Sequence, residues 1–420
     1  MRERANPVTP AVWLVLLAAG GTFALTMGAR QSMGLFLGNI NSSTGLGIAS
    51  ISLAFAVGQL WWGLTQPVAG LMADRIGAGR VMVVGVLMVA LGTALIPLMH
   101  TTAGLVLAIG VLAAGGAGLA GPSVLMAATT RLIPPEKRGM ATGIVNAGGS
   151  FGQFLFVPIA QGISAVAGWA AAVQSLALLS LLALPAAWVL RGSGASALTM
   201  AAAAGTPAAT APVSSGTALR GALADPNYRL LSAGFFVCGF HVAFIATHLP
   251  GVVASCLLPP AVGAWSLAIV ALFNIIGSFA IGWAIGFQGG RWRMKSLLAL
   301  IYATRALAVL LFVLAPKTET TMLVFAAAIG LTYLSTVPPT AGLVAKFHGT
   351  AHMGLLFGVV MLAHQLGGFL GAYLGGKSFE LTGSYDWMWY ADIVLAVAAA
   401  LLHLPIREAR RPALPLPAVA

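Results

Sequence analysis

An arginine inside an apolar stretch is the residue of this sequence with the clearest chemical potential. Arg30 lies in a mostly apolar run that extends from Ala11 to Ile40. A charge at membrane depth costs about 2.5–3.5 kcal/mol on insertion scales, so a chain that retains one usually has a partner or a task for it. A guanidinium can hold a carboxylate through two parallel hydrogen bonds, and we therefore expect Arg30 to bind an anion. The alternative is that Arg30 marks the outer end of this stretch and extends its head into the lipid headgroups.

Further polar side chains lie within or at the ends of other apolar stretches and could donate hydrogen bonds to the same ligand. A buried amide, phenol or imidazole is as often satisfied by a neighbouring helix, so each keeps a structural alternative. Arg305 lies at the centre of its stretch, and for it a structural role is as well supported as a binding role. The candidate substrate-binding residues are Arg30, Gln31, His241, Asn274, Tyr333, His364 and Gln365.

The acidic residues favour an anionic over a cationic ligand. All nine are expected in loops, in tails or near the ends of apolar stretches, whereas exporters of cationic compounds need a negative group at membrane depth. The sequence has no cluster of metal ligands, no paired carboxylates and no sizeable soluble segment. We therefore expect a protein that is not an enzyme and that needs neither a metal nor a cofactor.

The elements that must position these residues are membrane-spanning helices. The chain has 420 residues, of which 59% are hydrophobic and 7% charged, and its mean hydropathy is +0.96. A soluble protein has about 25% charged residues. Apolar runs near the length that crosses a bilayer recur without strand-like alternation, so we expect an all-α integral membrane protein. Twelve spans are predicted, at about 11–38, 48–70, 80–99, 104–130, 140–164, 168–190, 229–250, 262–286, 296–314, 321–344, 352–376 and 387–405.

The net charge of +12 follows the predicted topology and is not the basic surface of a nucleic-acid-binding protein. With the N-terminus inside, the outer loops hold only Lys317 and Lys377, and the other loop and tail cations fall on the cytosolic side. The positive-inside rule then places both termini in the cytosol and supports an even number of spans. The compact loops suit a multi-pass protein of a bacterial inner membrane, and we expect a monomer.

A segment rich in Ala, Gly, Ser, Thr and Pro divides the spans six and six. Residues 191–226 lack the apolar pattern of a core and are predicted to be a flexible cytosolic linker. They separate an N-terminal six-helix bundle at 1–190 from a C-terminal six-helix bundle at 227–406, which is followed by a cytosolic tail at 407–420. Two bundles of this kind are expected to be related by an axis along the membrane normal.

The loop after the second predicted span resembles a known signature. Gly70, Asp74, Arg75, Gly77 and Arg80 are similar to the loop between helices two and three of the major facilitator superfamily. The resemblance implies the major facilitator fold, with two pseudo-symmetric bundles. It also implies that Asp74 pairs with a basic residue across the bundle boundary and locks the outward-facing state. The alternative is a surface charge cluster that only fixes the topology.

A second family-like stretch, RLIPPEKRG, ends at Arg138 and Gly139 between spans four and five. We assign Arg138 to the conformational-gating motif together with Gly70, Asp74, Arg75, Gly77 and Arg80.

A narrower resemblance begins at Arg30. The run RQSMGLFL is similar to the first-helix segment of the monocarboxylate transporter family and its bacterial relatives near the oxalate-formate exchangers. In that family the basic residue takes part in proton and carboxylate handling. The family commonly carries an Asp and an Arg in the eighth helix, whereas this sequence has Phe273 and Asn274 there and no charge before Gly286.

These observations predict a secondary transporter that moves a small, monocarboxylate-like organic anion by alternating access. Whether protons are coupled as in a symporter stays open; if they are, a histidine is the expected carrier, because its charge changes in the physiological pH range. The alternative is an exporter of amphiphilic neutral or anionic compounds. The expected partners are the anion, the lipid bilayer and, with coupling, protons, but not nucleic acid.

Overall fold

The computed structural model describes residues 10–132, 138–191, 214–286, 292–349 and 352–408, and the regular structure within these ranges is helical throughout. The N-terminal half contains α1 (Pro10–Gln31), η1 (Met33–Phe36), α2 (Leu37–Thr44), α3 (Ile48–Ile76), α4 (Ala78–Leu95), η2 (Ile96–Leu98), α5 (Thr102–Leu105), η3 (Val106–Ala113), α6 (Ala114–Leu119), α7 (Pro122–Leu132), α8 (Arg138–Ala167), α9 (Trp169–Leu181) and α10 (Leu184–Val189). The C-terminal half contains α12 (Ser215–Ala224), α13 (Pro226–Ser255), α14 (Pro260–Gly286), α15 (Met294–Leu314), α16 (Glu319–Thr332), α17 (Val337–His348), α18 (Met353–Thr382) and α19 (Asp386–His403).

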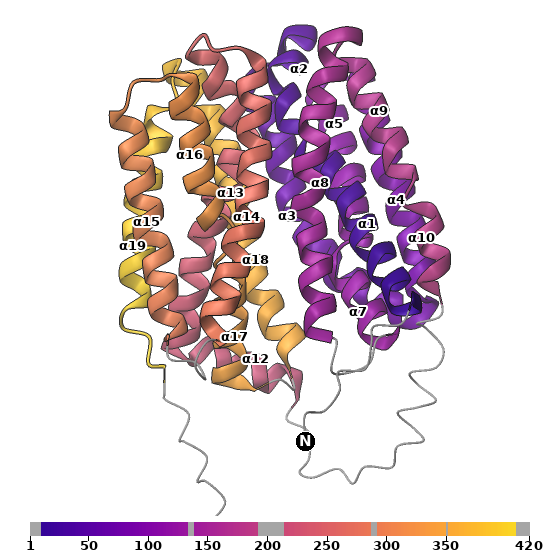
Figure 1. The fold of residues 1–420 in the computed structure, drawn as a ribbon, viewed down its shortest axis with the longest axis vertical. Helices are drawn as coiled ribbons and strands as arrows, with labels where there is room; N and C mark the ends of the chain where they lie inside the picture. The colour runs from indigo at the N-terminus through magenta and orange to yellow at the C-terminus, as the bar shows by residue number, and fades with distance from the viewer. Residues whose placement is uncertain (1–9, 133–137, 192–213, 287–291, 350–351, 409–420) are drawn as a thin grey trace, which may run out of the picture.

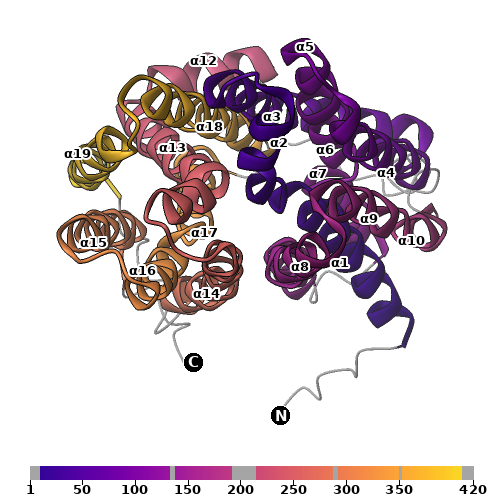
Figure 2. The same cartoon turned by 90° about the horizontal axis from the view of Figure 1, so that it is seen from above.

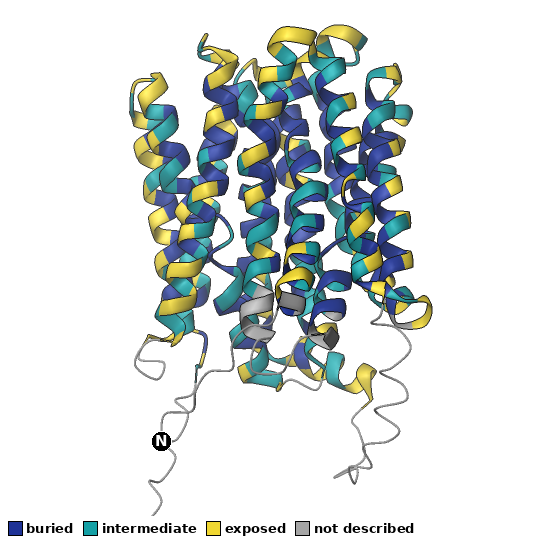
Figure 3. Cartoon of the chain, turned by 45° about the vertical axis from the view of Figure 1, so that its right-hand side comes forward, coloured by how far each residue is buried: buried dark blue, intermediate teal, exposed yellow. Residues whose placement is uncertain are grey.

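Twelve of the described helical segments are long and apolar enough to cross a membrane. Their outward surfaces expose large apolar side chains, among them Leu17 at 67%, Leu178 at 68% and Leu314 at 73% (Figure 3). Such surfaces are stable in lipid, where a helix also satisfies its own backbone hydrogen bonds. The predicted all-α membrane fold with twelve spans is confirmed.

Several spans, among them the first, fourth, sixth and tenth, are interrupted where the prediction had continuous helices. The first changes from α1 through the 3₁₀ turn η1 into α2, the fourth contains the π-helical η3, and the tenth stops at Thr332 and resumes at Val337. Pro338 and Pro339 explain the last break, because they cannot donate the backbone hydrogen bonds of a continuous helix. The carbonyls of Thr332 and Tyr333 at this break accept hydrogen bonds from a side chain of another helix.

The two halves lie side by side and meet along two pairs of helices (Figure 2). α3 packs on α18 along one side of the boundary, and α8 packs on α14 along the other. We call the end that carries α2 the α2 end and the opposite end, which carries α7, α12 and α17, the α12 end (Figure 1). The predicted topology would place the α12 end in the cytosol.

A short helix occupies part of the segment predicted to be a flexible linker. α12 begins where the Ser214 hydroxyl accepts a hydrogen bond from the Thr217 backbone N–H, as an N-cap does, and its Ala222 is fully buried. The structure thus has a helix within the predicted linker, and its buried Ala222 packs with Tyr228 and Leu231 of the C-terminal half. The domain boundary at residue 226 stays a prediction. Residues 192–213 lie outside the described residues.

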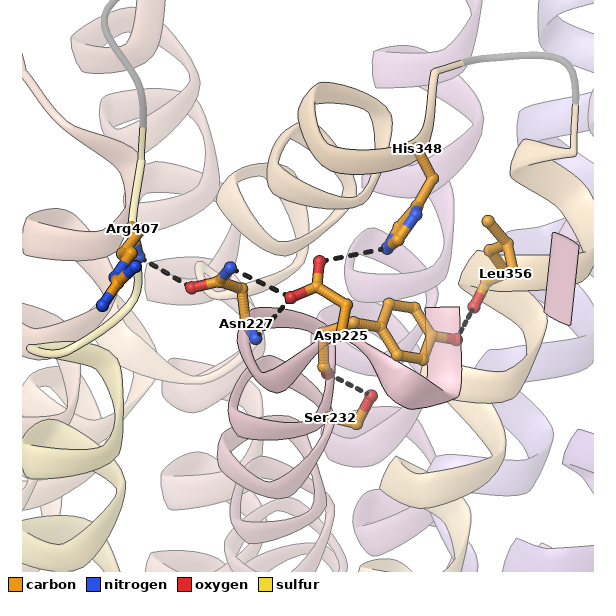
Figure 4. Close-up of polar contacts among 7 residues, drawn as sticks. Asp225, Asn227, Ser232, His348, Leu356 and Arg407 are labelled. Atoms are coloured by element: carbon orange, nitrogen blue, oxygen red, sulfur yellow. Dashed lines mark hydrogen bonds and ion pairs between the residues drawn. The ribbon is translucent and has the colours of Figure 1, made fainter. Parts of the chain in front are cut away.

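Polar contacts fasten the α12 end of the C-terminal half (Figure 4). Asp225 caps α13 by accepting a hydrogen bond from the Asn227 N–H at 2.8 Å, and it lies 3.6 Å from His348 Nε2 of α17. The Asn227 side-chain oxygen accepts from the Arg407 N–H at 2.8 Å, and the Tyr228 hydroxyl donates to the Leu356 carbonyl at 2.7 Å. Arg407, the first residue of the predicted cytosolic tail, is thus held against the bundle through its backbone N–H.

Glycines bring α13 and α18 into backbone contact, and one of them supports a stability prediction. A Cβ on Gly239 would collide with the His364 carbonyl of α18, whereas a Cβ on Gly21 of α1 would meet no atom within 4 Å. We expect Gly239→Ala to destabilise the protein by about 1–3 kcal/mol, because two backbones must separate. Thermal unfolding in detergent measures this. Gly21→Ala is the matched control and should be neutral or slightly stabilising, and an equal effect of the two would refute the packing argument.

Candidate functional site

A pocket lies at the boundary between the two halves. The empty space between its lining atoms is about 440 Å³, a figure that counts adjoining open solvent and is therefore not the volume of an enclosed cavity. α1, η1, α3, η3 and α6 line it from the N-terminal half and α13 from the C-terminal half. Its lining residues include Arg30, Gln31, Phe55, Gln59, Ala246 and Thr247. We call this cavity the interface pocket.

Arg30 is the charged residue among those that line the interface pocket. Its guanidinium donates one hydrogen bond, at 2.7 Å, to the side-chain oxygen of Gln59, and it lies 5.2 Å from the centre of the Trp62 ring. No carboxylate of the described residues lies within ion-pair distance of it. A guanidinium has five N–H donors, so most of its hydrogen-bonding capacity is available to a ligand. The cation is thus supported by a neutral amide and an aromatic face, and its charge is left for an anion to balance.

Local structure at the end of α1 orients Arg30. The Ser32 hydroxyl donates to the Gly28 carbonyl at 2.7 Å, and such back-bonding bends a helix, here at the transition to η1. A Cβ on Gly28 would lie 2.8 Å from the Phe156 ring, which shows how closely α8 packs on α1. Glycine and serine at these two positions therefore hold the guanidinium beside α3.

The other predicted binding residues are distributed over several environments. Gln31 lines the interface pocket and lies 3.5 Å from the Gln153 amide oxygen. Asn274 connects the halves, because its amide donates to the Ser150 hydroxyl at 2.7 Å and its oxygen accepts from the Leu334 N–H at 2.9 Å. Their role in binding stays a prediction.

Tyr333, His364 and Gln365 are buried, and none of them is among the lining residues of the interface pocket. The Tyr333 hydroxyl donates to the Val242 carbonyl of α13 at 2.8 Å. The His364 ring packs on Phe235 with 4.8 Å between the ring centres, and Gln365 contacts Gly63 of α3. This conformation uses these side chains for packing, and their substrate contacts stay predictions for another state.

His241 also lies away from the pocket, inside the C-terminal half. Its Nδ1 is 3.3 Å from Arg305 Nη1, and its Nε2 is 2.9 Å from the Asp392 carbonyl and 3.3 Å from the Asp392 carboxylate. Arg305 also donates to the carbonyls of Thr332 and Tyr333, at the break between α16 and α17. Arg305 therefore has at least a structural role, because it satisfies carbonyls that the broken helix leaves free. We call Arg305, His241 and Asp392 the buried triad.

Asp392 corrects the prediction that no acidic residue lies at membrane depth. The residue is fully buried, although it lies less than two turns into α19 and was assigned to a span end. Asp392 contacts His241, which lies near the middle of the long helix α13. Asp392 therefore lies deeper in the protein than its short distance from the start of α19 indicates. An anionic ligand is therefore favoured by the interface pocket, where Arg30 has no carboxylate partner among the described residues.

The predicted gating motif forms the connection between α3 and α4. Gly77 has φ +92°, which favours glycine, and its N–H donates to the Ala73 carbonyl to end α3. Arg75 and Arg80 are exposed on either side of this turn. The side chains of Asp74 and Arg138 and residues 133–137 lie outside what the structure describes, so the predicted lock stays a prediction.

Sequence reasoning missed the pocket residues Gln59 and Thr247. Gln59 is an uncharged amide in an apolar span, three residues before Trp62, so both can lie on one helix face beside Arg30. That spacing was a usable signal. Thr247 carried none, because it reaches the pocket only through the packing of α13 against η1.

A helical membrane protein with two six-span halves and a mostly apolar pocket that holds a guanidinium at their boundary has an architecture typical of membrane transporters. The model of the Major Facilitator Superfamily matches residues 18–372, and the chain belongs to that family. It is a multi-pass membrane transporter, and its fold and relatives are those of transporters, not enzymes.

Known proteins resemble the chain at low identity. Monocarboxylate transporter 13 of Rattus norvegicus is 26% identical over 397 residues, which are 94% of this chain and 89% of that protein. The oxalate:formate antiporter of Oxalobacter formigenes is 27% identical over 183 residues, or 43% of each chain. The crystal structure of a bacterial homologue of the human lysosomal transporter Spinster, in an inward-facing and unoccupied conformation, superposes with a TM-score of 0.68 at 16% identity, covering 94% of this chain and 97% of that one.

Proposed function

We propose that the protein is a secondary active transporter of a small, monocarboxylate-like organic anion, and that Arg30 binds the carboxylate of the substrate. The observation that carries the proposal is a guanidinium on the interface pocket with a neutral hydrogen-bond partner and no described carboxylate beside it. A carboxylate can accept two parallel hydrogen bonds from this group and balance its charge. The named activities of the monocarboxylate and oxalate:formate relatives support the same class of substrate.

The apolar part of the pocket supports a substrate with a small organic body. Phe55, Met33 and Ile109 line the cavity together with Arg30 and Gln59. A carboxylate at Arg30 would place its carbon chain against these side chains. We propose Gln31 and Thr247 as further hydrogen-bond donors at the same site, since both also line the pocket.

Alternating access is supported by the unequal contacts at the two ends of the boundary. Toward the α2 end, a Cβ on Gly376 of α18 would collide with Ser52 of α3, and one on Gly34 would collide with the Ala246 carbonyl. Toward the α12 end, Cβ atoms on Gly70 and Gly358 would meet no atom of the described residues within 4 Å. We infer a state closed at the α2 end, and we propose that the α12 end and both termini face the cytosol of a bacterial cell.

Glu380 is proposed to hold the α2 end closed. Its carboxylate, on α18, accepts a hydrogen bond at 3.1 Å from the Ala49 N–H in the first turn of α3, a helix without a side-chain cap of its own. A helix cap contributes about 0.5–2 kcal/mol, and here it joins the two halves. Glu380→Gln should therefore shift the population severalfold toward a state open at the α2 end. Distances between spin labels at Asn39 and Trp387, in a Cys256→Ser background, should lengthen.

Glu319→Gln is the matched control for this prediction. Glu319 is also exposed at the α2 end, in the first turn of α16, and neutralising it removes the same charge without touching the boundary. An equal shift in both variants, or none in Glu380→Gln, would rule out Glu380 as a latch between the halves.

Transport assays in proteoliposomes test the proposed function directly. Uptake of labelled formate, L-lactate, pyruvate and oxalate, with and without a pH gradient, should exceed that of protein-free liposomes for at least one monocarboxylate. Competition among the panel would locate the preferred chain length. Resistance of cells to amphiphilic compounds without uptake of any organic acid would instead select the exporter.

A further inference from the structure

The buried triad lies outside the interface pocket, because none of its residues is among the lining residues of that pocket. Arg305 and His241 are 1% exposed and Asp392 is 0% exposed, and they come from α15, α13 and α19. A buried charge in a membrane helix is costly to retain and is therefore a reason to look for a function. We propose that Asp392 is a proton-binding site whose protonation is coupled to anion binding at Arg30. The proposal rests on the proposed function, because it names the coupling ion of the same transporter.

The geometry defines the protonation state of the imidazole. Arg305 has only N–H donors, so the His241 Nδ1 that lies 3.3 Å from its Nη1 must be the acceptor. The ring proton of a neutral His241 is then on Nε2, which faces the Asp392 carbonyl at 2.9 Å and the carboxylate at 3.3 Å. A neutral His241 therefore lies between Arg305 and Asp392, and it accepts a hydrogen bond from Arg305 and donates one to Asp392. Protonating its Nδ1 would require the guanidinium to move away.

Asp392 is the group of the triad that can accept a proton without displacing a neighbouring side chain. Apart from the contact with His241, neither carboxylate oxygen has a hydrogen-bond partner among the described residues. A buried carboxylate that lacks hydrogen bonds loses the solvation that stabilises its charge, so binding a proton competes with staying ionised.

Arg305 is the permanent charge among the groups around Asp392. His241 of α13 and Arg305 of α15 face the carboxylate directly. Beyond them lie further titratable groups of the same half, contributed by α13, α15, α18 and the end of α16. These are Cys238, Tyr302, His364 and Tyr333.

Tyr333 connects the triad to the interface pocket. Its carbonyl accepts a hydrogen bond from Arg305 at 2.9 Å, and its hydroxyl donates to Val242 of α13, the helix that carries Ala246 and Thr247 to the pocket. Val242 lies four residues before Ala246 on α13, about one helical turn from the pocket lining. Tyr333, at the break of the tenth span, therefore links Arg305 to the helix that lines the interface pocket without lining the pocket itself.

The sign of the coupling follows from the charges. A proton on Asp392 removes the negative charge that offsets Arg305, which makes the interior more positive and strengthens anion binding at Arg30. By reciprocity, a bound anion strengthens proton binding at Asp392. Anion and proton then move together in the same direction, with the proton taken from solution when the anion binds.

L-Lactate binding at two pH values tests this coupling. The affinity of the wild-type protein should be about five- to tenfold tighter near pH 6 than near pH 8, a typical size for coupling between two sites. Asp392→Asn, which imitates the protonated acid, should keep the tighter affinity at both values. Asp386→Asn, on the exposed first turn of the same helix, is the matched control and should keep the wild-type pH dependence. An Asp392→Asn protein with unchanged pH dependence would overturn the proton site and leave anion transport intact.

A spectroscopic measurement tests the site without any substrate. Between about pH 8 and about pH 5, infrared difference spectra of the wild-type protein should gain the carbonyl band of a buried protonated carboxylic acid, which Asp392→Asn should abolish and Asp386→Asn retain. Absence of the band in the wild-type protein would refute the proposal.

If Asp392→Asn does not fold, proton uptake by wild-type protein on addition of L-lactate in weak buffer decides the question. Lactate binding without proton uptake would contradict the proposal, whereas the band without transport of any monocarboxylate would contradict only the proposed function.

Discussion

Arg30→Gln is expected to weaken carboxylate binding and uptake by about two orders of magnitude. A hydrogen bond to a charged group contributes about 1.5–3 kcal/mol, and a carboxylate paired with Arg30 would lose two of them together with its counter-charge. Glutamine keeps a polar side chain beside Gln59, so the loss would report on the guanidinium and not on an empty volume. The measurement is the concentration dependence of labelled L-lactate or formate uptake in proteoliposomes.

Arg30→Lys separates charge from geometry in the same assay. Lysine retains the positive charge but not the planar fork, and it is expected to recover only part of the affinity. Arg191→Gln is the matched control, because Arg191 is an exposed arginine that stacks on Trp188 away from the pocket. Full uptake by Arg30→Gln, or an equal loss in Arg191→Gln, would exclude Arg30 as the anion-binding group.

Arg305→Met is expected to destabilise the protein by about 3–5 kcal/mol, the range found when one of two opposite buried charges is removed and the other is left uncompensated. The substitution leaves Asp392 without a counter-charge and removes the donor of the Thr332 and Tyr333 carbonyls at the helix break. Thermal unfolding in detergent, with size-exclusion chromatography as a test of folding, measures the effect. Much of the loss should be recovered by adding Asp392→Leu, because the second substitution removes the unpaired acid.

Arg220→Met provides the comparison for this prediction. Arg220 is an exposed arginine on α12, so its loss should change the unfolding temperature little. If Arg305→Met were as stable as the wild-type protein, the carbonyls at the helix break and Asp392 would not depend on the guanidinium. The prediction of coupling through Tyr333 would then lose its physical basis.

The spans and Arg30 could be predicted because their signals are local. Long apolar runs define the twelve helices, and a single charge within one of them stands out from its neighbours. The break of the tenth span had a local signal as well, because Pro338 and Pro339 follow directly after Thr336 and Val337. The helix α12 had a weaker one, the Ser214 cap before a short run of alanine and leucine.

The environments of His241 and Asp392 could not be predicted because they depend on contacts between distant helices. His241 lies in a span that also lines the pocket, and only its position on the helix circumference directs it to Arg305. Asp392 was placed near a span end because sequence gives the distance from a helix start but not the depth to which that start is buried. Both residues acquire their partners from packing among α13, α15 and α19.

The most direct test of anion binding at Arg30 is a crystal structure with a transported monocarboxylate bound. We predict that its carboxylate lies in the interface pocket within hydrogen-bonding distance of both terminal nitrogens of Arg30, with Gln59 displaced from its 2.7 Å contact or shared with the ligand. A carboxylate bound elsewhere, with the Arg30 to Gln59 hydrogen bond unchanged, would contradict the account.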